Sequence, residues 1–231
     1  MERLALSFIE QMSEEELNNL CFHLTFMSSM DQIDANGLGA RKGFNSSGEL
    51  GREKTAKVFF SKGYTQTLAM VNRAMDIINR ALSTGDVELI TKFGLDPNMD
   101  VMSNIAQLLD KMIYYVLNIK GVSKKEYETL SEEEKARISY LTDDLDEETG
   151  KVMEDANMHT ISGVGVPETS LVKVFGDNGE VVSSLEIIKA LCKRFKELHP
   201  DMQLPTRHQS VNHLENFYNE VILNEVNQRA I

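Results

Sequence analysis

The chain has 231 residues, of which 42% are hydrophobic and 26% charged, and its formal net charge is −12. The hydrophobic fraction excludes an intrinsically disordered chain, which combines low hydrophobicity with high net charge. A uniformly acidic surface would repel nucleic acid and anionic membranes, so any such contact requires a local basic site. No repeat and no Pro- or Ser-rich linker divides the sequence, which therefore predicts a single domain over residues 1–231.

The first third of the chain predicts short elements followed by a glycine-rich loop. Ser13-x-x-Glu16 has the form of a capping box at a helix start. The elements expected after that helix are a strand over 20–26, a short helix over 28–36 that Gly37 ends, a loop over 37–54 and a strand over 57–61.

The middle third predicts helices. Apolar residues recur at steps of three and four over 68–82 and again over 101–116, which is typical of one helix face. Asp96-Pro97 is typical of a helix start, so residues 97–119 are predicted to be mostly helical. Residues 123–155 carry twelve acids against five bases, which indicates either a solvated helical surface or a surface that binds a partner or mimics nucleic acid.

The last third returns to strand and then helix. Residues 170–182 surround Asn178-Gly179, a strong hairpin signal. A helix from Ser183 to about His199 and a last helix from about Thr206 follow. The fold class predicted is therefore α+β, with a sheet built from N-terminal and C-terminal strands and a helical insert over about residues 65–155.

The cysteines and histidines do not indicate a metal site. Cys21 and Cys192 lie in apolar stretches outside any CxxC or Cys/His spacing, which favours buried free thiols. His208 and His213 would lie about 140° apart on a helix, so they do not share a face. There is no apolar run near the ~20 residues of a membrane span and no signal-peptide pattern at the N-terminus, so we expect a cytoplasmic protein without a membrane partner.

Charge is distributed unevenly along the chain. Residues 37–67 carry six bases against two acids, within the same stretch that holds the glycines and several aromatic residues. Glycines let backbone N–H groups approach a ligand, Arg and Lys pair with phosphate, and aromatic rings stack on bases. The stretch matches neither a P-loop nor a dinucleotide-binding Gly-x-Gly-x-x-Gly fingerprint. It is either a nucleotide- or nucleic-acid-binding loop or a mobile basic surface loop.

Two patches resemble the ADP-ribosyltransferase-like folds. The first is Phe22-His23-Leu24-Thr25, the short helix through Ile33, Asn36-Gly37-Leu38 and the 57–61 strand. It is similar to the opening of the diphtheria-toxin and poly-ADP-ribose-polymerase branch, whose first strand carries His-x-Thr/Ser. The second patch, 157–160 and 165–172, is similar to the late strand of these folds and to the Pro-Glu-x-x-Leu segment that follows it.

The resemblance implies NAD as the cofactor and a set of site residues. His23, with Thr25 beside it, is implied to bind the nicotinamide ribose, and Tyr64 or Phe60 to stack on nicotinamide. Many members carry a catalytic glutamate where this sequence has Asn157 and His159. The expected cofactor contacts are His23, Gly39, Arg41, Phe60, Ser61 and Tyr64, and the expected catalytic residues are His23, Thr25, His159 and Glu154, with Asp155 and Glu168 as the other carboxylates that could serve.

Three functions follow as hypotheses. The first is an NAD-dependent ADP-ribosyltransferase-like protein acting on a protein or nucleic-acid target. The second is a non-catalytic interaction protein that uses the acidic surface. The third is a nucleic-acid-end or phosphate-processing enzyme that uses the basic loop, His23 and His159, for which the tRNA 2′-phosphotransferases are the nearest example. For both histidines, a core residue bonded to backbone stays an open alternative.

Overall fold

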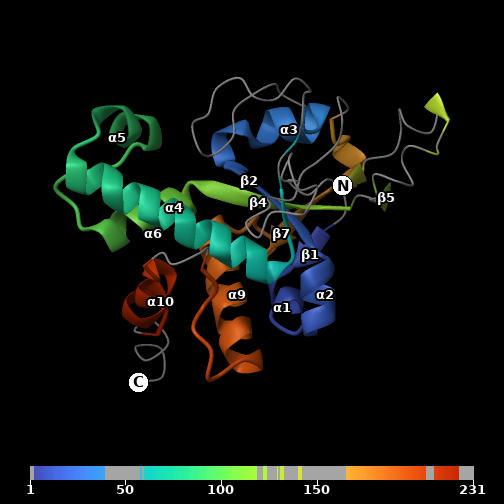
Figure 1. Ribbon diagram of the computed structural model, residues 1–231. Helices are drawn as coiled ribbons and strands as arrows, with labels where there is room; N and C mark the ends of the chain where they lie inside the picture. Colours follow the sequence, from blue (N-terminus) through green and yellow to red (C-terminus); the bar gives the residue numbers. More distant parts are fainter. Residues whose placement is uncertain are drawn as a thin grey trace.

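The computed structural model describes residues 3–39, 58, 60–118, 122–123, 129, 131–132, 140–141, 165–206 and 211–223. These residues confirm the α+β class: one mixed sheet takes strands from both ends of the chain, and helices pack on it (Figure 1). The strands are β1 (Arg3–Ala5), β2 (Cys21–Phe26), β3 (Ser61–Lys62), β4 (Met112–Leu117), β5 (Val122–Ser123), β6 (Tyr140–Leu141) and β7 (Leu171–Phe175). The helices are α1 (Leu6–Ile9), α2 (Glu14–Asn19), α3 (Met30–Asn36), α4 (Tyr64–Thr84), α5 (Val87–Phe93), α6 (Val101–Asp110), α9 (Ser184–Leu198) and α10 (His213–Phe217), with short 3-10 turns η1 (Met27–Ser29) and η2 (Glu168–Ser170) and a π-helical turn η3 (Tyr218–Ile222).

The strand order of the main sheet is β1-β7-β4-β2-β3, and β5 and β6 form a separate short pair. The β1 and β7 strands run parallel, whereas β7, β4, β2 and β3 pair antiparallel in that order. The sheet therefore places the N-terminal β2 two strands from the C-terminal β7, with β4 from the middle of the chain between them.

The predicted helix over residues 97–119 is wrong at its start and in its second half, because Pro97 lies in a turn that precedes the helix. The α6 helix begins after Asp100, whose side chain accepts a hydrogen bond from the Ser103 backbone N–H, and it ends at Asp110. Residues 112–117 form β4, and five of these six residues are buried. A central strand that is apolar on both faces loses its alternating pattern, so its apolar positions also fit helical spacing.

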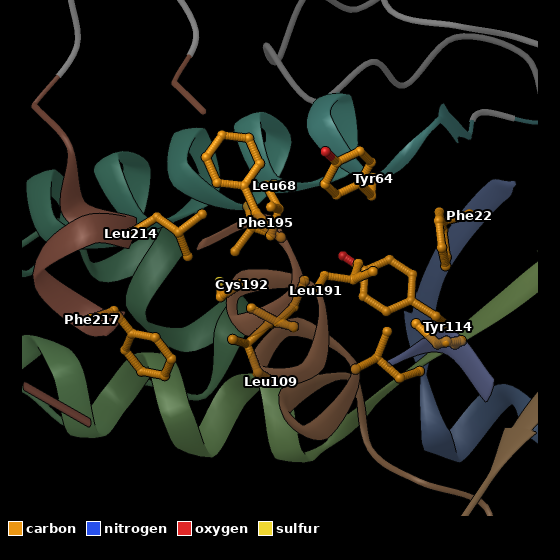
Figure 2. Packing of buried hydrophobic residues seen from close by; sticks show 14 of the residues in the cluster. Phe22, Tyr64, Leu68, Leu109, Tyr114, Leu191, Cys192, Phe195, Leu214 and Phe217 are labelled. Carbon is orange, nitrogen blue, oxygen red and sulfur yellow. The ribbon is translucent and has the colours of Figure 1, made fainter. Parts of the chain in front are cut away.

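Two clusters of buried side chains fill the two faces of the sheet. One face meets α4, α6 and α9, with α10 packed on α4, and its core includes the residues labelled in Figure 2, among them Phe22 and Tyr114. The opposite face meets α3, and its smaller core includes Ile33, Phe60 and Tyr115. Figure 1 shows α3 on one side of the strands and α9 on the other. The sheet is thus the middle of three layers.

Several predicted element boundaries are confirmed. The capping box of α2 is present in full, with the Ser13 hydroxyl accepting from the Glu16 backbone N–H and the Glu16 carboxylate accepting from the Ser13 backbone N–H. The α3 helix ends at Gly37, which has a φ of 73°, and α9 ends one residue before His199. A turn at Gly179 follows β7, and Phe175 bridges back to Val181 as the hairpin signal predicts.

Other predictions hold only in part. Of the strand predicted over 57–61, the described residues show Ser61 in β3 and Val58 and Phe60 outside any strand. The helix predicted from Thr206 begins at His213. Most of the glycine-rich loop and most of the acidic stretch over 123–155 lie outside the described residues.

The two cysteine thiols are free and buried, as predicted. Burial raises the pKa of Cys21 to about 11, with nearby Lys62 acting in the opposite direction. Burial also raises the pKa of Cys192 well above that of an ordinary thiol. Both side chains therefore stay protonated at neutral pH and act as small apolar core residues. Within the described residues, no helix combines the length and apolar character needed to cross a membrane.

Candidate functional site

The face of the sheet that meets α3 carries His23. In β2, Phe22 and Leu24 belong to the core on the α4 side, and successive strand residues point to opposite faces. The side chains of His23 and Thr25 therefore project to the α3 side. Both residues are half-buried, so they are partly accessible from the surface that this face presents.

His23 is one end of a polar row that crosses four strands. It pairs with Tyr115 of β4, Tyr115 pairs with Lys173 of β7, and Lys173 pairs with Arg3 of β1. Residues paired in this way share a face, so all four side chains lie on the α3 side. Leu117 of β4 pairs with Leu171 of β7, and both are buried in the α3-side core, as is Cys21 of β2. The polar row therefore lies beside buried apolar residues on the same face.

An aspartate from α3 reaches the middle of the polar row. The Tyr115 hydroxyl donates a hydrogen bond of 2.7 Å to Asp34 Oδ1, and Lys173 Nζ forms an ion pair with Asp34 Oδ2. The Tyr115 side chain is fully buried. Burial, and then the bond and charge of Asp34, raise the pKa of Tyr115 far above that of an ordinary tyrosine. Tyr115 therefore acts as a hydrogen-bond donor and not as an anion.

The residues predicted to contact the cofactor divide between the two faces. Phe60 lies in the α3-side core with Tyr115, although only 6% of it is exposed. Ser61 pairs with Phe22 and so faces α4, where its hydroxyl lies 2.7 Å from that of Thr67. Tyr64 begins α4, and its ring is buried in the α4-side core (Figure 2). The structure therefore brings Phe60 to the His23 face and places Ser61 and Tyr64 on the other side of the sheet.

The Tyr64 hydroxyl has partners of its own. It lies 3.1 Å from His199 Nε2 and 3.3 Å from Glu14 Oε1, and the same histidine nitrogen lies 3.1 Å from Glu14 Oε1. Burial and then the Glu14 charge raise the pKa of Tyr64. This contact joins the starts of α2 and α4 to the end of α9. It gives Tyr64 a packing role, which differs from the stacking role that the resemblance implies.

The two patches that resemble the ADP-ribosyltransferase-like folds are hydrogen-bonded to each other. The Leu38 and Val166 backbones form an antiparallel bridge with two N–H···O distances of 2.8 Å. Gly37 comes before this bridge, and a Cβ built on Gly37 would lie 2.2 Å from the Val166 carbonyl oxygen and 3.0 Å from the Glu168 nitrogen. The bridge therefore places Glu168, which is exposed on η2, beside the turn that follows α3.

Some predicted site residues fall outside the described part of the chain. Gly39 is described, and it follows the Leu38 bridge. Arg41, Glu154, Asp155 and His159 lie in the undescribed ranges. Of the three carboxylates considered for the catalytic role, Glu168 is the one within the described residues.

Sequence reasoning missed Asp34, Tyr115 and Lys173. In the sequence, Asp34 is a polar residue of a predicted short helix, and Tyr115 falls within the predicted helix over 97–119. Their contact depends on the strand register and on the position of α3, and no spacing in the sequence indicates either. A signal existed only for Lys173, which interrupts an apolar strand between Val172 and Val174. Among the described residues, no group of three or more His, Cys, Asp or Glu side chains is arranged to hold a metal ion.

Comparisons of this chain with models of protein families, with curated proteins and with solved structures found no match. The function must therefore be inferred from the residues themselves and from the resemblance of the two patches.

Proposed function

We propose that this protein is an NAD-dependent ADP-ribosyltransferase-like protein whose dinucleotide binds on the α3 side of the sheet, next to His23 and Thr25. The observation that carries this proposal is the Leu38–Val166 bridge. The two patches lie more than 100 residues apart in the sequence, and the bridge joins them beside one face of one sheet. A chance resemblance gives no reason for the two patches to be in contact.

His23 and Thr25 supply the polar groups that this function needs. An imidazole and a hydroxyl two residues apart on one strand lie on the same face, where they can hydrogen-bond to ribose hydroxyls. The His23 side chain is only half-buried, so the loss of its ring need not empty a tightly packed core. This supports a ligand-binding role for His23 over the alternative of a core residue.

In the proposed reaction, the bond between C1′ of the ribose and the nicotinamide nitrogen breaks, and the electron pair leaves with nicotinamide. The ribose becomes oxocarbenium-like, so a nearby carboxylate stabilises its positive charge. A nucleophile of the target then forms a bond to C1′ and loses its proton. Glu168 is the described carboxylate that adjoins the Gly37 turn, and we propose it, with Glu154 and Asp155, as a candidate for the stabilising group. We expect the target to be a cytoplasmic protein or nucleic acid.

The test compares two histidine variants with the wild type. Millimolar NAD should raise the melting temperature of the wild type, because a ligand that binds the folded state stabilises it. His23→Ala should abolish that shift and lower the free energy of unfolding by only about 1 kcal/mol, a typical single-site effect. His199→Ala, on the far side of the sheet, should keep the shift. If His23→Ala lowers the free energy of unfolding by several kcal/mol and the variant still binds NAD, His23 is a core histidine and the proposal is refuted.

A non-catalytic interaction protein is the second candidate, and one observation favours it. Asp34, the described acid that touches the polar row, already pairs with Lys173 and Tyr115, so its carboxylate is engaged in holding the fold. If NAD leaves the melting temperature of the wild type unchanged, the result favours a non-catalytic interaction protein over the transferase-like function. Retention of radiolabelled RNA with a steep dependence on salt would instead support a phosphate-processing enzyme.

A further inference from the structure

Asp34 connects three elements that come from different parts of the sequence. It lies on α3, and its carboxylate contacts Tyr115 of β4 and Lys173 of β7. Only 26% of the Asp34 side chain and 14% of the Lys173 side chain are exposed, so solvent screens this ion pair less than a surface pair. The contact therefore holds α3 against the sheet at one defined point.

The charge of Asp34 also offsets a repulsion within the sheet. Lys173 pairs with Arg3 on the neighbouring strand, and like charges that face each other across two strands are destabilising. The Arg3 guanidinium lies over the Phe175 ring, 4.8 Å from the ring centroid, whereas Lys173 turns to Asp34. Without the aspartate, Lys173 would keep a largely buried charge beside a second cation.

Asp34 is three residues before Gly37 and four before Leu38, which bridges to Val166. Lys173 is seven residues after Val166 in the same segment of chain. The ion pair and the backbone bridge are therefore two attachments between the same two segments, residues 34–38 and 166–173. Since two attachments fix the position of a short segment better than one, loss of the ion pair leaves the turn held by its backbone bridge alone.

We infer that Asp34 is a positioning residue for the dinucleotide site: it holds the turn after α3, and through Tyr115 it orders the strand position next to His23. This inference rests on the proposed function for its ligand, which is NAD. Asp34 itself contacts neither the ribose nor the reacting atoms in this account. Its effect passes through the Leu38–Val166 bridge and through the Tyr115 ring.

The experiment uses the full chain and a matched control. Asp34→Ala removes both contacts, whereas Asp34→Asn keeps an oxygen that accepts from the Tyr115 hydroxyl and places an amide NH2, in place of the charged oxygen, against Lys173. Glu215→Gln is the control, because Glu215 also pairs with a partly buried lysine, Lys196, and accepts a second hydrogen bond, from the Leu204 backbone. Three quantities are measured for each variant: stability in urea, the Kd for NAD, and hydrogen exchange at the Leu38 and Val166 amides.

We expect Asp34→Ala to raise the Kd for NAD about tenfold or more and to speed exchange at both amides by a similar factor, as for loss of a hydrogen bond to a charged group. Asp34→Asn should fall between Asp34→Ala and the wild type. Glu215→Gln should lose about as much free energy of unfolding as the Asp34 variants, with no change in the Kd for NAD or in hydrogen exchange at these two amides.

Two results would overturn the inference. One is an Asp34→Ala protein in which both amides exchange at the wild-type rate. The other is an equal loss of NAD affinity in Glu215→Gln, which would show that the effect follows general stability. If the wild type binds no NAD, the proposed function fails by itself, and the exchange rates still decide whether Asp34 holds the turn.

Discussion

Gly37→Ala tests the contact between the turn after α3 and Val166. Gly37 has φ 73° and ψ −172°, a region of backbone conformation that essentially only glycine adopts, so a side chain there costs about 1–3 kcal/mol. The new Cβ would also lie 2.2 Å from the Val166 carbonyl oxygen, which forces the two bridged segments apart. Loss of the two Leu38–Val166 hydrogen bonds adds about 0.5–1.5 kcal/mol each. We therefore expect a total loss of about 2–6 kcal/mol.

Gly85→Ala separates the contribution of the bridge from that of backbone strain. Gly85 is left-handed with φ 67°, and nothing lies within 4 Å of a Cβ built on it. Its substitution should cost about 1–2 kcal/mol, the strain of a left-handed residue alone. Urea denaturation with linear extrapolation measures the loss of unfolding free energy in both variants. NAD binding is then titrated under conditions in which each variant is folded. Equal losses for the two variants would refute the argument that the Gly37 turn is held tightly against Val166.

Three further predictions test other parts of the fold. Ser13→Ala should lower the free energy of unfolding by about 1 kcal/mol through loss of the α2 cap, and a thermal melt identical to the wild type would contradict the capping box. Tyr64→Phe, which removes the hydroxyl beside Glu14, should cost about 1 kcal/mol and leave NAD binding intact; weakened NAD binding would show that Tyr64 belongs to the site after all. Burial raises the pKa of Cys21 from 9.0 to about 11 and also raises that of Cys192. Each thiol therefore ionises at lower pH in the unfolded chain than in the folded protein, so the free energy of unfolding should fall as pH rises from 9 to 11. At pH 8 neither thiol should react with a disulfide reagent until the protein unfolds, and rapid reaction of the native protein would exclude the buried positions.

The features that can be predicted from the sequence are those that depend on neighbouring residues. The α2 capping box needs only Ser13 and Glu16, and the end of α3 needs only Gly37. The amphipathic face of α4 follows from apolar residues three and four apart, and the turn after β7 follows from Asn178-Gly179. In each case the controlling contacts lie within about one turn of helix or one hairpin, so the local pattern carries the information.

Which side chains come into contact depends on the tertiary structure. The run over 112–117 became a strand because it is buried on both faces of the sheet, and burial on both faces removes the alternation that marks a strand in sequence. His23 and Tyr64 are both plausible site residues in the sequence, yet strand register and the direction of α4 place them on opposite sides. Asp34, Tyr115 and Lys173 form one cluster because antiparallel pairing of β4 with β7 sets their register beneath α3. Register depends on packing between segments far apart in the chain, so it is fixed only when the whole domain folds.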